Sequence, residues 1–275
     1  MTATYRPAEP IWCAGCGHFG VEAALTTALA DLDIPKQETL ILAGIGCSGT
    51  IQNNMGTYGY HALHGRVLPT ATGSWEANPA LTVIAAGGDG DGYAIGMGHL
   101  IHTFRRNPSI TYIVMNNGIY GLTKGQNSPT RQGTPTLDAV LLGLSVLETT
   151  FIARGFTRAP DQLRRLTTAA LTHTRQGRGF AFLEVLSPCV TYNDTYPRWE
   201  TEHIDLDTDD TYNPTDRTSA FATVVKLETE GRIPIGTIYH NPTAEPGTFP
   251  NPATANIDPA TNADTYTDII DQYRI

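Results

Sequence analysis

Four cysteines are the residues best suited to chemistry in this chain of 275 residues. Cys13 and Cys16 form a C-x-x-C pair in the glycine-rich segment WCAGCGHFG (12–20), while Cys47 and Cys189 stand alone. Such thiols bind metals or take part in redox chemistry. Three interpretations are open: cysteines scattered through a core, a tetrahedral zinc site, or an iron–sulfur cluster. The glycines around the pair disfavour the first, and spacing alone does not separate zinc from iron.

A carboxylate and an amide form a second candidate site. Asp89 lies in GGDGDG (87–92) after one apolar run, and Asn117 ends the next apolar run. Carboxyl ends of parallel strands meet at one sheet edge, so we expect Asp89 and Asn117 to converge there. Their oxygens suit Mg²⁺, and the glycines let backbone N–H groups approach phosphate. The alternative is a tight turn at GDGDG and a simple strand end at NN.

Alternating apolar runs and helical patterns must position these residues. The runs are nearly continuous rather than alternating, which predicts a mostly parallel, doubly wound α/β sheet covered on both faces. We expect strands at 39–46, 80–88, 109–117 and 179–186, helices at 19–32, 92–107 and 161–177, and a helix followed by a strand within 137–156. Segment 46–66 is expected to be an irregular, functional loop.

The composition changes after the last predicted strand. We predict one domain at 1–193 and a C-terminal extension at 194–275 that packs on this domain or on a partner subunit. Within the extension, 219–231 predicts a helix and 233–240 a strand. The remainder is rich in Pro, Thr, Asn and Asp, so it predicts an irregular arm on another surface or a disordered tail.

Charge and composition exclude several classes of protein. The net charge of -9 argues against nucleic-acid binding, and no apolar run approaches the ~20 residues of a membrane helix. The N-terminus lacks the basic and apolar regions of a secretory signal. Four cysteines do not suggest a secreted disulfide scaffold. We therefore predict a cytoplasmic protein that binds neither nucleic acid nor membrane.

The second site resembles a known cofactor motif. GDG, 25 intervening residues (91–115) and NN resemble the thiamine diphosphate motif. The resemblance implies that Mg²⁺ is held by the side chains of Asp89 and Asn117 and by the carbonyl of Ile119. It also implies cofactor contacts by Gly90, Gly121 and Leu122. Beside thiamine chemistry an iron–sulfur cluster has a role as electron acceptor, whereas a redox-inert zinc ion has none that is evident.

Ordered blocks across most of the chain resemble one family. These blocks run from Trp12 to Asn193 and resemble the β subunits of 2-oxoacid:ferredoxin oxidoreductases: WCAGCGHFG, GIGCSGT, TYGYHALHGR, GGDGDGYAIG, NNGIYGLTKGQNSPT and LSPCVTYND. The resemblance implies a thiamine diphosphate-binding fold and one [4Fe–4S] cluster ligated by Cys13, Cys16, Cys47 and Cys189. It further implies cofactor contacts by Ile45, Gly46, Cys47 and Ser48. Ala14 replaces the proline usual in the first block, which removes no ligand.

The resemblance also implies a reaction and partners. A 2-oxoacid is oxidatively decarboxylated with thiamine diphosphate, the acyl group passes to coenzyme A, and electrons pass through the cluster to ferredoxin. An α subunit, or a fused γα subunit, supplies the glutamate that activates the cofactor. We therefore expect little turnover from this chain alone, and activity from an assembly of αβ units.

Two residues bear on acid–base chemistry and substrate. His64, in LHGR, is a candidate catalytic residue. Lys124 stands where pyruvate-type relatives usually have glycine, and its charge favours 2-oxoglutarate, whose second carboxylate it would attract. Lys124 pairing with a partner subunit or coenzyme A is the alternative, and Thr50, where some relatives have a basic residue, argues against 2-oxoglutarate. A pyruvate or broad-specificity enzyme, a non-redox thiamine enzyme with structural zinc, and a non-catalytic metal-binding partner remain as further alternatives.

Overall fold

A mainly parallel sheet forms the centre of the molecule, as predicted. The computed structural model describes residues 8–133 and 135–247. The sheet has eight strands in the order β2-β1-β3-β4-β8-β7-β10-β9, and only β7 and β10 pair in antiparallel fashion. These strands are β1 (Thr39–Ala43), β2 (Tyr58–His61), β3 (Thr82–Gly88), β4 (Thr111–Asn116), β7 (Phe151–Phe156), β8 (Ala181–Leu186), β9 (His203–Asp205) and β10 (Ile233–His240). A separate antiparallel hairpin joins β5 (Ile119–Tyr120) and β6 (Gln126–Asn127).

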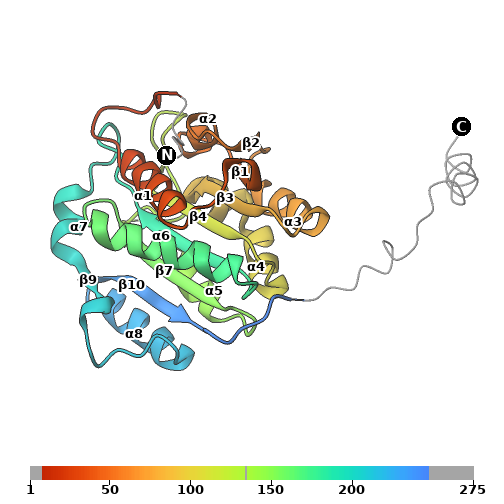
Figure 1. The fold of residues 1–275 in the computed structure, drawn as a ribbon. Coiled ribbons are helices and arrows are strands. Elements are labelled where there is room, and N and C mark those ends of the chain that lie inside the picture. The colour runs from red at the N-terminus through yellow and green to blue at the C-terminus, as the bar shows by residue number, and fades with distance from the viewer. Residues whose placement is uncertain (1–7, 134, 248–275) are drawn as a thin grey trace, which may run out of the picture.

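Helices cover both faces of the sheet (Figure 1). The helices are α1 (His18–Asp31), α2 (Ile51–Asn54), α3 (Val67–Ala77), α4 (Met97–Arg106), α5 (Ala139–Leu144), α6 (Pro160–Arg175), α7 (Tyr196–Glu202) and α8 (Arg217–Thr229). Helices α1 and α6 pack side by side over one apolar core, and α3, α4, α5 and α8 cover the other. In β4, Ile113 and Met115 enter the first core while Tyr112 and Val114 enter the second. Strand residues alternate between faces, so one apolar run fills both cores.

Local signals fix the helix ends. Helix α6 begins at Pro160, whose missing N–H costs nothing in the first turn of a helix. Helix α8 begins after Asp216, whose carboxylate accepts hydrogen bonds from the backbone N–H groups of Thr218 and Ser219, each at 3.0 Å. The predicted helix and strand of the extension are confirmed as α8 and β10.

Two segments differ from the sequence-based expectation. Segment 46–66 is not wholly irregular, because it contains α2 and the edge strand β2. All four residues of β2 are exposed, so this strand lacks the apolar run on which strand prediction depends. Segment 92–107 is not one α-helix, because a π-helical turn at Asp91–Ile95 precedes α4. The predicted C-terminal arm lies mostly outside the described residues.

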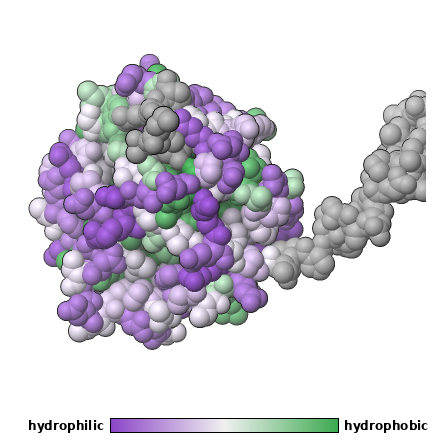
Figure 2. Space-filling model, in the orientation of Figure 1, coloured by the Kyte–Doolittle hydropathy of each residue, from purple (hydrophilic) through white to green (hydrophobic). Residues whose placement is uncertain are grey.

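The described surface is largely polar. Figure 2 shows mainly hydrophilic residues on the face that carries α1 and α6, with hydrophobic residues in small patches. Within 8–133 and 135–247, none of the helices combines the length and the apolar character that crossing a membrane requires.

Candidate functional site

Two cavities meet at the carboxyl edge of the parallel strands. The first, here called the carboxylate cavity, has a volume of about 180 Å³ and contains Asp89 in its wall. The second, the cysteine cavity, has a volume of about 230 Å³. The two share wall residues His18, Cys47, Asn117, Gly121 and Leu122. Loops after β1, β3, β4 and β8 build these walls, which is where open α/β sheets bind ligands.

The carboxylate cavity gathers the residues that the thiamine motif singled out. Its wall contains every predicted cofactor contact, together with all three predicted Mg²⁺ ligands: Ile45, Gly46, Cys47, Ser48, His64, Gly90, Gly121 and Leu122, with Asp89, Asn117 and Ile119. These residues come from four separate stretches of the chain. Residues that are far apart in the sequence therefore lie around one cavity in the structure.

Asp89 is held rigidly at the end of β3. Its Oδ2 accepts hydrogen bonds from the hydroxyls of Ser128 and Thr130, the latter at 2.6 Å. Its Oδ1 accepts one from the backbone N–H of Asn117 at 3.3 Å. Burial raises the pKa of the Asp89 carboxyl, and these hydrogen bonds oppose that shift. A bound cation would favour the charged carboxylate here.

Asp91 is a site residue that the sequence analysis missed. Its Oδ1 accepts hydrogen bonds from the backbone N–H groups of Ile45 and Gly65, at 2.9 and 2.8 Å, and lies 2.7 Å from His64 Nδ1. One buried carboxylate thus ties two loops to the GDGDG turn and fixes the His64 ring through Nδ1. Gly44 is required beside it, because an added Cβ would lie 2.0 Å from Asp91 Oδ2. The second aspartate of GDGDG was the available signal.

All four cysteines line the cysteine cavity. Cys13 is exposed, the other three are half-buried, and all four are free thiols. The backbone is braced around them: Cys16 N–H donates to Cys13 O at 3.0 Å, Trp12 Nε1 to Cys47 O at 2.7 Å, and Asn193 N–H to Cys189 O at 2.9 Å. Burial raises the pKa of Cys16 to about 11 and also raises the pKa of Cys47. Thiols in this environment form thiolates chiefly when a metal replaces the proton.

The four thiols line one cavity and do not converge on a single position. In the part of the chain that the structure describes, no three His, Cys, Asp or Glu side chains converge closely enough to hold a single metal ion. The cysteine cavity has instead the volume of several water molecules, each of which takes about 30 Å³ in the liquid.

Direct contacts connect the two cavities. Asn193 Nδ2 donates to the carbonyl of Asn117 at 2.7 Å, which joins the Cys189 loop to the end of β4. His18 Nδ1 lies 2.7 Å from Ser187 Oγ, at the end of β8. Burial lowers the pKa of His18 to about 4, so its ring is neutral at pH 7. A hydrogen bond therefore ties the loop that carries Cys189 to the residues of the thiamine motif.

Lys124 is not brought into either cavity. It is exposed at the tip of the β5–β6 hairpin, where its backbone φ is 76°. Glycine adopts this left-handed conformation most easily, which explains why glycine suits this position. Its neighbour Thr123 does line the carboxylate cavity, so Lys124 stands just outside the rim.

Comparisons with known proteins agree on one group of enzymes. The family described as thiamine pyrophosphate enzyme, C-terminal TPP binding domain, matches residues 44–185, and the C-terminal family of the pyruvate ferredoxin oxidoreductase β subunit matches 189–248. Subunit beta of 2-oxoacid:ferredoxin oxidoreductase 1 from Aeropyrum pernix is 40% identical over 251 residues, which cover 84% of this chain and 78% of the relative. The 2-oxoglutarate synthase subunit KorB of Methanocaldococcus jannaschii is 37% identical over 194 residues, 66% of this chain and 70% of that one.

A solved structure is similar over nearly the whole chain. It is a 2-oxoglutarate:ferredoxin oxidoreductase from Magnetococcus marinus, with 2-oxoglutarate, coenzyme A and succinyl-CoA bound. The match has a TM-score of 0.81 and 30% identity, and it covers 98% of this chain and 95% of that chain.

Proposed function

The chain belongs to the β subunits of the 2-oxoacid:ferredoxin oxidoreductases, and from this premise we propose that it serves a 2-oxoglutarate enzyme. The proposed reaction converts 2-oxoglutarate and coenzyme A to succinyl-CoA and CO₂, with the electrons passed one at a time to ferredoxin. The main support for this proposal is the wall shared by the two cavities, because it places the proposed cofactor site next to the four thiols.

Oxygen donors at the carboxylate cavity fit thiamine diphosphate with Mg²⁺. Asp89 supplies a buried carboxylate, and we propose that Asn117 and the Ile119 carbonyl complete the protein's share of the ligands. Gly46 has a backbone φ of 120° and room beside it, which lets a backbone N–H group approach phosphate, while Gly90 packs against the Tyr120 ring. When bound, thiamine diphosphate supplies the electron sink for decarboxylation. His64, fixed by Asp91, is proposed to hold or move a proton at the cofactor or substrate through Nε2.

Thiol donors at the cysteine cavity fit a [4Fe–4S] cluster. The four cysteines match the ligand number of such a cluster, and their cavity is larger than one ion requires. Beside thiamine diphosphate an iron–sulfur cluster would serve as electron acceptor, whereas zinc is redox-inert. Free thiols of this kind suit a reducing compartment, which supports our proposal of a cytoplasmic location.

A partner subunit is proposed to cover the carboxylate cavity. Leu122 and Ile45 line the cavity, yet their exposed fractions are 64% and 37%. Large apolar side chains at the rim of a site indicate a surface that another protein covers. We propose that an α or fused γα subunit binds here and supplies the activating glutamate. Lys124, at the rim, is proposed to meet a group from outside the chain: the second carboxylate of 2-oxoglutarate, coenzyme A or the partner.

The division of the chain also remains our proposal. We assign cofactor and cluster binding to 1–193 and a packing role to 194–275. Support comes from α8 and β10, which extend the covered sheet without contributing to the wall of either cavity.

The test is anaerobic purification of the αβ complex, followed by reduction of ferredoxin with different 2-oxoacids and coenzyme A. We expect a brown protein with broad absorbance in the blue region and the fastest reduction with 2-oxoglutarate. Faster reduction with pyruvate would favour the pyruvate-type alternative. A colourless, zinc-containing complex, or no reduction with any 2-oxoacid, would contradict the proposal, and so would substantial turnover by the isolated chain.

A further inference from the structure

Glu184 lies on β8, outside both halves of the metal-binding motif. We propose that Glu184 is a positioning residue that locks the GDG half to the NN half, so that metal affinity at Asp89 depends on it. This inference rests on the proposed function of the carboxylate cavity. It assigns a role to a buried charge that lines neither that cavity nor the cysteine cavity.

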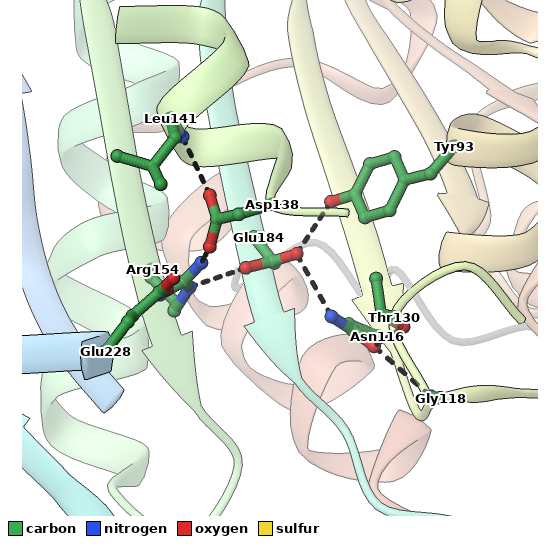
Figure 3. A network of polar contacts seen from close by, with 9 residues as sticks. All are labelled: Tyr93, Asn116, Gly118, Thr130, Asp138, Leu141, Arg154, Glu184 and Glu228. Atoms are coloured by element: carbon green, nitrogen blue, oxygen red, sulfur yellow. Dashed lines mark hydrogen bonds and ion pairs between the residues drawn. The ribbon is translucent and has the colours of Figure 1, made fainter. Parts of the chain in front are cut away.

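One oxygen of Glu184 joins the two halves directly. Its Oε1 accepts hydrogen bonds from the Tyr93 hydroxyl at 2.8 Å and from Asn116 Nδ2 at 3.1 Å (Figure 3). Tyr93 lies in the helical turn that follows Asp89, and Asn116 immediately precedes Asn117. Helix α4 separates the two donors in the sequence, and Asn116 is the last residue of β4. A residue from a third strand therefore sets the spacing between them.

The Asn116 amide carries this constraint to the metal site. Its Oδ1 accepts a hydrogen bond from Gly118 N–H at 3.2 Å and lies 2.9 Å from Thr130 Oγ1. The Thr130 hydroxyl has one hydrogen, which it donates either to Asn116 Oδ1 or to Asp89 Oδ2 at 2.6 Å. A flipped Asn116 amide would place two donors face to face at Gly118 and would lose the bond to Glu184. Glu184 thus fixes the orientation of an amide whose oxygen holds Gly118, the residue after Asn117, and lies beside Thr130.

An ion-pair network holds Glu184 from the opposite side. Arg154 Nε donates to Glu184 Oε2 at 2.5 Å, and the same guanidinium binds Asp138 at 2.5 Å and Glu228 at 3.1 Å. Figure 3 shows these carboxylates around Arg154. The ion pair holds the Glu184 carboxyl group from the Oε2 side, while Oε1 accepts two hydrogen bonds from the other side. Glu228 lies on α8, so the C-terminal segment contributes to this ion-pair network.

Residues that hydrogen-bond to metal ligands orient those ligands and thereby commonly affect the affinity for the metal. Loss of such a partner typically weakens metal binding 10–100-fold, on the order seen for other outer-shell residues. We expect a change of roughly this size when the Glu184 bonds are removed.

Tyr93→Phe tests the proposal, with Tyr112→Phe as a matched control. Both tyrosines are buried in the same core against Phe182, with ring centroids 6.4 and 6.1 Å from it. The Tyr93 hydroxyl binds Glu184, whereas among the described residues the Tyr112 hydroxyl has no hydrogen-bond partner. Each variant αβ complex is stripped of metal and titrated with Mn²⁺ in the presence of thiamine diphosphate, and free Mn²⁺ is measured by electron paramagnetic resonance.

We expect Tyr93→Phe to raise the Mn²⁺ dissociation constant roughly 10-fold and Tyr112→Phe to leave it nearly unchanged. Glu184→Gln is the second variant, and it should weaken Mn²⁺ binding while excess Mn²⁺ restores activity. Equal dissociation constants for Tyr93→Phe, Tyr112→Phe and the wild type would overturn the proposal, as would equal weakening by both tyrosine variants. A wild-type complex that binds no Mn²⁺ with thiamine diphosphate would instead contradict the proposed function.

Discussion

Replacing Arg154 with methionine should strongly destabilise the fold. The Arg154 side chain is 5% exposed and pairs with Glu184, Asp138 and Glu228, which are 2%, 17% and 32% exposed. Methionine fills much of the same volume but leaves Asp138 and Glu184 without their counter-ion, whereas burial and the neighbouring Asp138 raise the pKa of Glu228 to about 8. Breaking a buried pair in this way costs about 3–5 kcal/mol of the free energy of unfolding. For a chain of this size we expect a melting temperature lower by roughly 10 °C.

Differential scanning calorimetry of the wild type, Arg154→Met and Arg164→Met measures this loss. Arg164 is the matched control, because it pairs with Asp31 on the surface, where both side chains are substantially exposed and water screens the interaction. Equal melting temperatures for the two variants would refute the reasoning.

Three further substitutions test other parts of the structure. Burial, His240 and Arg178 lower the pKa of His173 from 6.5 to about 3, so below pH 6.5 the unfolded chain takes up a proton that the folded chain does not. The free energy of unfolding should therefore fall by about 2 kcal/mol between pH 8 and pH 5 because of this histidine. In urea titrations the His173→Gln variant should not show this loss. The same pH dependence in the variant and the wild type would contradict the prediction. Lys124→Gly should stabilise the chain by about 0.5–1 kcal/mol, because glycine relieves a backbone φ of 76°, and a lower denaturation midpoint would refute this. Asp91→Ala leaves three donors without an acceptor, so calorimetry should show weaker thiamine diphosphate binding by the αβ complex, whereas unchanged affinity would exclude a role in shaping the cavity.

Much of the fold could be predicted because its signals are local. Apolar runs identified β1, β3, β4 and β8, and their nearly continuous character indicated a sheet buried on both faces. The exposed strand β2 was missed because it forms no apolar run and joins the sheet by pairing with β1. Pairing of this kind depends on tertiary position, which a local pattern does not record.

Some residues of the candidate site could likewise be predicted from local sequence patterns, and others could not. Cysteine spacing and the GDG and NN segments were visible because each lies within a few residues or recurs in a known motif. The β5–β6 hairpin places Lys124 outside both cavities, and its expected contact with the substrate stays a prediction. Asp91 was overlooked because the loops that it joins are distant in sequence and meet only when β1 and β3 pair.

The sequence by itself determined which side chains lie at the carboxyl edge of the sheet, because the residues that follow each parallel strand lie at that edge. Only the tertiary structure decided which strands are neighbours there. Glu184 appears in the sequence as a lone charge within an apolar strand, GFAFLEVL, with nothing nearby to neutralise it. Its partners Tyr93, Asn116 and Arg154 come from three other elements. They reach it because β8 lies between β4 and β7, an order set by how the whole sheet buries its two faces.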